Sequence, residues 1–111
     1  MKTKVYKELP REAYEIRKVV FMDEQGFQNE FDEIDHQAKH IVLFDDVMPI
    51  ATCRYFHGES EGEYIIGRIA VISSYRGRHI GEYLLKEAEK KIKKDGGTLI
   101  LLHAQNRARV F

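Results

Sequence analysis

The sequence predicts an α/β (α+β) fold, in which a mixed, mostly antiparallel central sheet is flanked by helices. Short apolar runs rich in β-branched residues recur along the chain, acidic turns join the middle ones, and a long helical pattern separates the last two. The chain has 111 residues, 43% of them hydrophobic, which suffices for one core. Residues 1–111 are therefore expected to form a single domain.

The first half of the chain predicts a strand, a helix and a hairpin. Residues 3–7 form the first strand, and Pro10 suits the first turn of a helix that ends at Gly26. Residues 40–44 and 49–56 are apolar runs separated by acidic turn residues, as in a hairpin. The apolar face of the helix carries Ala13, Ile16, Val19 and Val20.

The second half predicts a strand, a helix and a parallel strand. Residues 64–72 are rich in β-branched side chains, which is typical of a buried strand. Residues 81–94 have the 3.6-residue period of a helix, and residues 98–103 form another apolar strand. Because a helix connects the two strands, we expect them to be parallel neighbours.

The turn at residues 76–81, Arg-Gly-Arg-His-Ile-Gly, is where we expect a ligand. From Tyr64 to Gly81 there is no acidic residue, whereas Arg68, Arg76 and Arg78 are positive. Unpaired amides and the helix dipole at a helix start favour an anion such as phosphate, and glycines let the backbone come close. The alternative is an ordinary surface turn with solvated arginines. The strand before the turn and the helix after it favour the phosphate site.

This turn, after Arg68-Ile69-Ala70-Val71, resembles the acyl-CoA-binding motif of the GNAT superfamily of N-acetyltransferases, Arg/Gln-x-x-Gly-x-Gly/Ala. Arg76 and Gly81 match its first and last positions, whereas His79 replaces the central glycine. The resemblance implies that the turn amides bind the CoA pyrophosphate and that the preceding strand splays from its neighbour to pair with the pantetheine arm. The cofactor-binding residues that it implies are Ile69, Val71, Arg76, Gly77, Arg78, His79, Ile80, Gly81 and Gln105.

A second resemblance lies in the acidic segment, where no Lys or Arg occurs between Lys18 and Lys39. This segment is either a solvated loop with helix caps or a site that attracts a cationic amine. The motif that is similar to the ElaA-like branch of the GNAT proteins is Arg17-x-x-Val20-Phe21-x-x-Glu24-Gln25-Gly26, then Glu30-x-Asp32-x-x-Asp35 and His40. This motif is also similar to acyl-homoserine lactone synthases, which are longer and typically contain tryptophan.

The end of the chain partly matches a third GNAT pattern, Asn-x-x-Ala-x-x-Phe-Tyr. Gln105, Ala108 and Phe111 match its spacing, and the chain ends where the Tyr would follow. In that family the Asn contacts the pantetheine and the Tyr often protonates the CoA thiolate. We expect Val110 and Phe111 to be helix core residues, and the domain to be incomplete at its C-terminal end, without the last helix and two strands of the GNAT fold.

The resemblance implies an acetyl-CoA-dependent N-acetyltransferase that moves an acetyl group to a primary amine of a small molecule or peptide by direct attack. A backbone amide of the central strand, such as that of Val71, would polarise the thioester carbonyl. An amine with a pKa of about 10 must first lose a proton, so a base is needed. Glu24 is the preferred catalytic base, ahead of His36, His40 and His103.

Two alternatives to an N-acetyltransferase stay open. One is a non-catalytic CoA-binding or interaction module, which His79 and the missing Tyr favour. The other is an acyltransferase like the acyl-homoserine lactone synthases, which would use S-adenosylmethionine. In the GNAT fold the C-terminal part contributes to dimers, so a homodimer is also compatible with the resemblance.

Composition excludes other classes. The formal net charge is zero, which argues against nucleic acid as a partner. No apolar run approaches the roughly 20 residues of a membrane helix and the N-terminus does not resemble a signal peptide, so we expect no membrane partner and a cytoplasmic location. The histidines lack the spacing of metal ligands, so no metal is expected. Cys53 lies in an apolar strand, which favours a packing thiol over a nucleophile.

Overall fold

The computed structural model describes residues 1–27, 31–102 and 107–110. Its helices and strands follow the order predicted from the sequence up to the fifth strand. They are β1 (Lys2–Tyr6), α1 (Arg11–Arg17), the π-helical η1 (Lys18–Glu24), the 3-10 helix η2 (Glu33–His36), β2 (Lys39–Asp45), β3 (Met48–His57), β4 (Glu63–Val71), the 3-10 helix η3 (Ser73–Tyr75), α2 (Ile80–Lys94), β5 (Leu99–Leu102) and β6 (Arg107–Val110).

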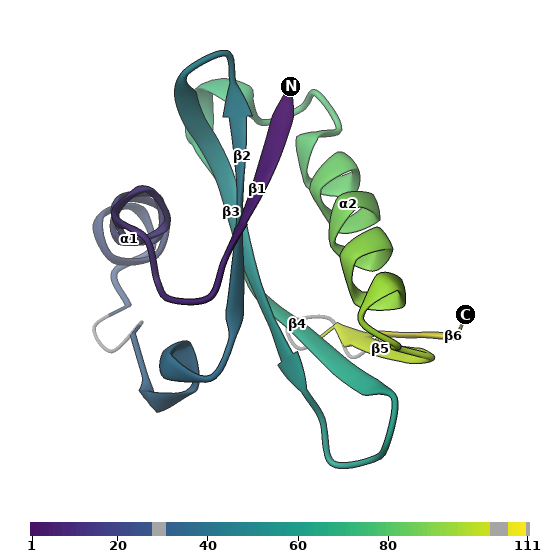
Figure 1. The fold of residues 1–111 in the computed structure, drawn as a ribbon. Helices are drawn as coiled ribbons and strands as arrows, with labels where there is room; N and C mark the ends of the chain where they lie inside the picture. Colours follow the sequence, from purple (N-terminus) through teal and green to yellow (C-terminus); the bar gives the residue numbers. More distant parts are fainter. Residues whose placement is uncertain (28–30, 103–106, 111) are drawn as a thin grey trace.

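The six strands form one sheet in the order β1-β2-β3-β4-β5-β6. Neighbouring strands are antiparallel except for β4 and β5, which are parallel, as the helix between them requires. Helix α1 lies on one side of the sheet and α2 on the other (Figure 1). The mixed, mostly antiparallel sheet flanked by helices that the sequence predicts is therefore confirmed.

Separate hydrophobic clusters cover the two faces of the sheet, and β2 contributes to both. Successive side chains of a strand point to opposite faces. Accordingly, Ile41 and Leu43 pack in the cluster that contains α2, whereas Val42 and Phe44 pack in the cluster that contains α1. The buried side chains of α2 recur at the spacing of one helical face and are Ile80, Leu84, Ala88 and Ile92.

The first helix departs from the expected regular pattern after Arg17. Ala13, Ile16 and Val20 are buried as expected, but Val19 is 41% exposed. Residues 18–24 form the π-helical η1, in which each turn takes more residues than in an α-helix. The wider turn rotates successive side chains differently, so the expectation that Val19 lies on the apolar face is wrong.

The C-terminal residues also differ from expectation. Arg107–Val110 form β6, which pairs antiparallel to β5 from Leu99↔Val110 to Leu102↔Arg107. The expectation that Val110 belongs to a helix is therefore wrong. One edge of β5 already pairs with β4, and β6 satisfies backbone groups on its other edge. Phe111 and Gln105 lie outside the described residues.

Among the described residues, no helix combines the length and apolar character needed to cross a membrane. Within the same part of the chain, no three His, Cys, Asp or Glu side chains gather in a group that could hold a metal ion.

Candidate active site

The site begins where β4 continues past β5. The parallel pairs run from Glu63↔Leu99 to Ile66↔Leu102, while β4 extends to Val71. Within residues 1–27, 31–102 and 107–110, nothing pairs with this far part of β4 on the side away from β3. An open strand edge offers N–H and C=O groups to an extended ligand. This end of β4 can therefore accept a ligand as an added strand.

A β-bulge lies in the same part of β4. Gly67 pairs with Arg54 and Ala70 pairs with Thr52, so two β4 residues stand opposite the single residue Cys53. The first of the two, Arg68, has a left-handed backbone with φ 51°. Bulges turn the strand locally and often redirect groups beside active sites. Ile69, the second bulge residue, and Val71 beyond it are only half-buried.

The turn after β4 leads through η3 into α2. The first backbone hydrogen bond of α2 runs from the Tyr83 N–H to the His79 carbonyl, at 3.1 Å. The N–H groups of Ile80 and Gly81 precede that bond and have no partner inside the helix. The Ile80 side chain itself is buried in the core. A pocket of about 240 Å³ lies here, lined by Val71, Tyr75, Arg76, Gly77, His79, Ile80, Gly81 and Glu82.

The space around the turn is open. Among the described residues, a side-chain Cβ placed at Gly77 or at Gly81 would meet no atom within 4 Å other than its chain neighbours and the backbone of its own helix. Gly77 also has φ +80°, a conformation that glycine adopts without strain. Backbone amides at the start of a 15-residue helix, with room in front of them, suit an anionic group.

His79 adopts a left-handed backbone conformation, which glycine adopts without strain. It stands at the N-cap of α2 with φ 59° and ψ 25°, in the left-handed region. Its side chain is 82% exposed and its Nδ1 lies 3.6 Å from Glu82 Oε2. The imidazole therefore points into solvent, and the left-handed turn forms despite the side chain.

Arg76, at the edge of this pocket, is held by two partners. Its Nη2 donates to Glu24 Oε1 at 2.7 Å, and its Nε donates to the backbone carbonyl of Val71 at 3.0 Å. Arg78 lies over the ring of Tyr75, with its Cζ 5.0 Å from the ring centroid. The expected catalytic base and the expected phosphate-binding arginine therefore contact each other.

Residues 3–110 match the acetyltransferase (GNAT) family. The chain belongs to this family. As a GNAT protein it is an acyltransferase, and its sheet and helices have the arrangement found in that family.

Known proteins agree with this assignment. The chain is 30% identical over 103 residues to the uncharacterised N-acetyltransferase YjcF of Bacillus subtilis, covering 91% of this chain and 72% of that protein. The structure of Escherichia coli ElaA has the same fold, with TM-score 0.78 and 20% identity, over 91% of this chain and 76% of that one. A GNAT acetyltransferase of Brucella melitensis, solved in complex with acetyl-CoA, superposes with TM-score 0.68 and 20% identity, over 91% and 75% of the two chains.

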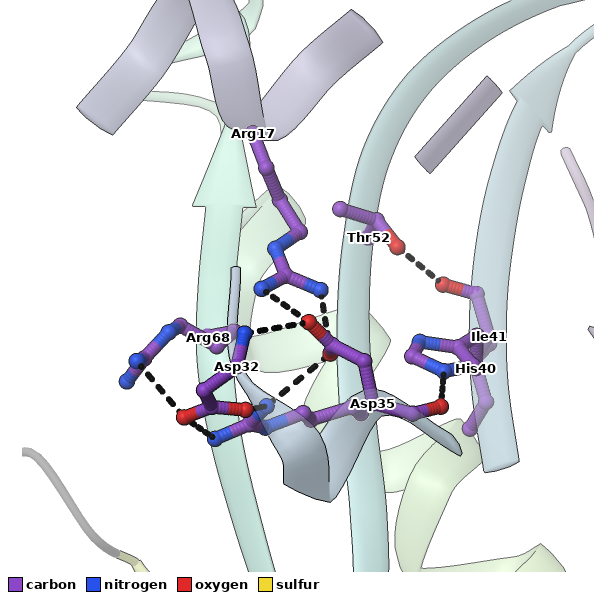
Figure 2. A network of polar contacts seen from close by, with 8 residues as sticks. Arg17, Asp32, Asp35, His40, Ile41, Thr52 and Arg68 are labelled. Atoms are coloured by element: carbon purple, nitrogen blue, oxygen red, sulfur yellow. Dashed lines mark hydrogen bonds and ion pairs between the residues drawn. The ribbon is translucent and has the colours of Figure 1, made fainter. Parts of the chain in front are cut away.

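Two of the six acidic residues between Lys18 and Lys39 in this GNAT chain, Asp32 and Asp35, belong to a network of arginine contacts (Figure 2). Arg17 donates to both carboxylate oxygens of Asp35, at 2.8 and 3.2 Å. Arg54 donates to Asp35 at 2.9 Å and to Asp32 at 2.6 Å. Arg68 also contacts Asp32, at 3.3 Å. Neither acidic residue is therefore an open site for a cationic amine, and the charge of Arg68 belongs to this network rather than to the basic turn.

The pKa values of two buried groups, Asp35 and His40, are lowered here, for different reasons. Burial opposes the charged form of Asp35, but the hydrogen bonds and charges of Arg17 and Arg54 outweigh it and lower the pKa of Asp35 to about 2. Burial lowers the pKa of His40. His40 Nε2 donates to the Asp35 carbonyl at 3.0 Å. Because His40 is buried and its ring is hydrogen-bonded to the Asp35 carbonyl, it has a structural role in this fold.

The remaining candidate bases lie in different places. Glu24 contacts the turn before α2 by accepting a hydrogen bond from Arg76. His36 is exposed and lines a pocket of about 440 Å³ beside η2, with Glu8, Leu9, Phe31, Asp32 and Asp35. His103 lies outside the described residues. Of the candidate bases that the structure describes, only Glu24 contacts a residue that lines the pocket at the start of α2 (the turn pocket).

Arg54 is the residue that sequence reasoning missed. Its side chain is 1% exposed and it joins Asp32 to Asp35 from the middle of β3. The sequence does indicate that Arg54 is paired, because an arginine inside the apolar run Ala-Thr-Cys-Arg-Tyr-Phe implies a buried acidic partner. Which acid it meets depends on how the loop before β2 folds back, and that is set by tertiary structure.

Proposed function

We propose that this GNAT protein transfers the acetyl group of acetyl-CoA to a primary amine of a small molecule or peptide. The observation that carries the proposal is the continuity of three features: the open end of β4, the bulge at Arg68 and the glycine turn before α2. An extended acyl donor lying along β4 would reach the turn with its anionic end. Each feature supplies the interaction that one part of such a donor requires.

The donor site consists of backbone amides reinforced by two arginines. In the proposal, the amides of residues 77–81 bind the pyrophosphate, with Arg76 and Arg78 adding charge-assisted contacts. The pantetheine arm pairs with Ile69 to Val71, as a strand would. The acetyl-CoA complex of the Brucella melitensis relative, which has the same fold, supports acetyl-CoA as the donor.

The transfer needs correct positioning, a polarised carbonyl and a proton acceptor. The amine nitrogen attacks the thioester carbonyl carbon, the C–S bond breaks, and the thiolate that leaves is protonated. A backbone amide near Val71 would stabilise the developing oxyanion. Glu24 is the proposed base, because Arg76 connects its carboxylate to the Val71 carbonyl at the end of β4.

A second candidate is a non-catalytic CoA-binding module. The contact between Glu24 and Arg76 favours it, because the carboxylate proposed as the base is engaged in an ion pair. The two candidates share the donor site and differ in turnover.

The test is an assay of CoA thiol release from acetyl-CoA with a panel of primary amines, with acetylated products identified by mass spectrometry. We expect turnover that falls at least tenfold in Glu24→Gln, since general base catalysis contributes on the order of 10²–10⁴-fold. Asp23→Asn, which removes a neighbouring exposed carboxylate, serves as the control. Tight acetyl-CoA binding without turnover would favour the module, and binding of S-adenosylmethionine would favour a lactone synthase.

A further inference from the structure

Glu24 and Arg76 form an ion pair that a stronger ligand can displace. They are 52 residues apart in the sequence, and their side chains remain 30% and 45% exposed. An ion pair of this exposure is weak, because water screens both charges. A diphosphate offers several anionic oxygens to a guanidinium in a geometry that permits paired hydrogen bonds.

The Arg76 side chain is anchored independently of Glu24. Its Nε donates to the Val71 carbonyl at 3.0 Å, and Arg76 lines the turn pocket whereas Glu24 does not. Arg76 therefore belongs to the pocket lining and also contacts the Glu24 carboxylate. Nη2 can change partner while Nε keeps its bond to β4.

In the described part of the chain, the charge partner of Glu24 is Arg76. In the part of the chain that the structure describes, its carboxylate contacts no other basic side chain. When Arg76 turns to a phosphate, Glu24 is left as an unpaired carboxylate beside the end of β4. Such a group attracts a cation, and an amine substrate is a cation before it loses its proton.

We propose that Arg76 exchanges Glu24 for the pyrophosphate of acetyl-CoA, so that donor binding releases the carboxylate that receives the acceptor ammonium. This inference rests on the proposed function and adds to it a link between the donor site and the acceptor site through the Arg76 guanidinium. In the free protein Glu24 competes with the donor for Arg76.

Calorimetric titration of acetyl-CoA into four variants tests the competition. Glu24→Gln is expected to bind acetyl-CoA roughly two- to fivefold more tightly than the wild type, the size expected for loss of an exposed ion pair. Asp23→Asn removes the same charge one residue away and should show a smaller change. Adding Glu24→Gln to Arg76→Gln should leave the affinity of Arg76→Gln unchanged, because the pair no longer exists.

Carbodiimide coupling of glycine ethyl ester, followed by peptide mass spectrometry, tests the release. Saturating CoA should accelerate labelling of Glu24 at least twofold and leave labelling of Asp23 unchanged. Unchanged or slower Glu24 labelling, or a Glu24→Gln effect that persists without Arg76, would overturn the exchange while leaving the donor site intact. Failure of the wild type to bind acetyl-CoA would instead overturn the proposed function.

Discussion

Arg17 and Asp35 form a two-point ion pair inside the protein, with Nη1–Oδ1 and Nη2–Oδ2 distances of 2.8 and 3.2 Å. Their side chains are 1% and 6% exposed. The pair ties α1 to the short helix η2, and Arg54 extends the connection to β3. The acidic residues that resemble the ElaA-like pattern thus fix the loop before β2 against the sheet.

Asp35→Asn is expected to destabilise the protein by about 3–5 kcal/mol, because it leaves two buried guanidinium groups without their shared carboxylate. Urea unfolding followed by circular dichroism measures the change. Glu33→Gln, in the same short helix but exposed, should change stability by less than about 0.5 kcal/mol. Equal losses in the two variants would mean that the network contributes nothing specific.

Acid should weaken the fold through Asp35. Its pKa in the folded protein is about 2, below the ordinary value of 3.8, so the unfolded state binds the proton more readily. The stabilisation is complete above about pH 5 and is lost as the pH falls from about 4 toward 2. The difference corresponds to about 2 kcal/mol. Urea midpoints between pH 5 and 2 measure it, and Asp35→Asn should show a shallower decline.

His79 offers a test of the strained turn. Its φ of 59° suits glycine, so His79→Gly should match or exceed the wild-type stability, by up to about 1 kcal/mol. His79→Val should lose about 1–3 kcal/mol, because a β-branched residue resists the left-handed region. Thermal unfolding of both variants measures the contrast. Opposite ranking of glycine and valine would show that the turn does not hold this conformation.

Cys53 should behave as a packing residue. Its side chain is 1% exposed, and burial raises the pKa of its thiol to about 12. The native protein should therefore react with iodoacetamide at pH 8 at least tenfold more slowly than the protein in denaturing urea. Mass spectrometry follows the adduct. Rapid modification of the folded protein would contradict this burial.

Local sequence patterns were sufficient to predict the elements whose signals are local. The acidic hairpin turn, the 3.6-residue period of α2 and the glycines of the turn predicted β2, β3 and α2 to within about two residues, and the parallel β4–β5 pair followed from connectivity. Cys53 was likewise predicted to be a packing thiol, and it is buried.

Features that depend on distant contacts were not predictable in this way. The arginine partners of Asp32 and Asp35 come from three different elements. The sequence alone therefore could not show that these two carboxylates are already paired and not available to a cationic amine. The π-helical turn that exposes Val19 and the strand pairing of Arg107–Val110 depend on tertiary context rather than on residue preference. Likewise, nothing local indicated that Glu24 would meet Arg76.

The most direct test of the donor site is calorimetric titration of acetyl-CoA into the wild type and into Arg76→Glu/Arg78→Glu. We expect micromolar binding by the wild type and at least a hundredfold loss in the variant. The thermal midpoint should fall by no more than a few degrees, because both side chains are exposed and the Glu24–Arg76 ion pair is weak. Equal affinity in the two proteins, or no binding by either, would contradict the assignment of the turn before α2 as the acetyl-CoA site.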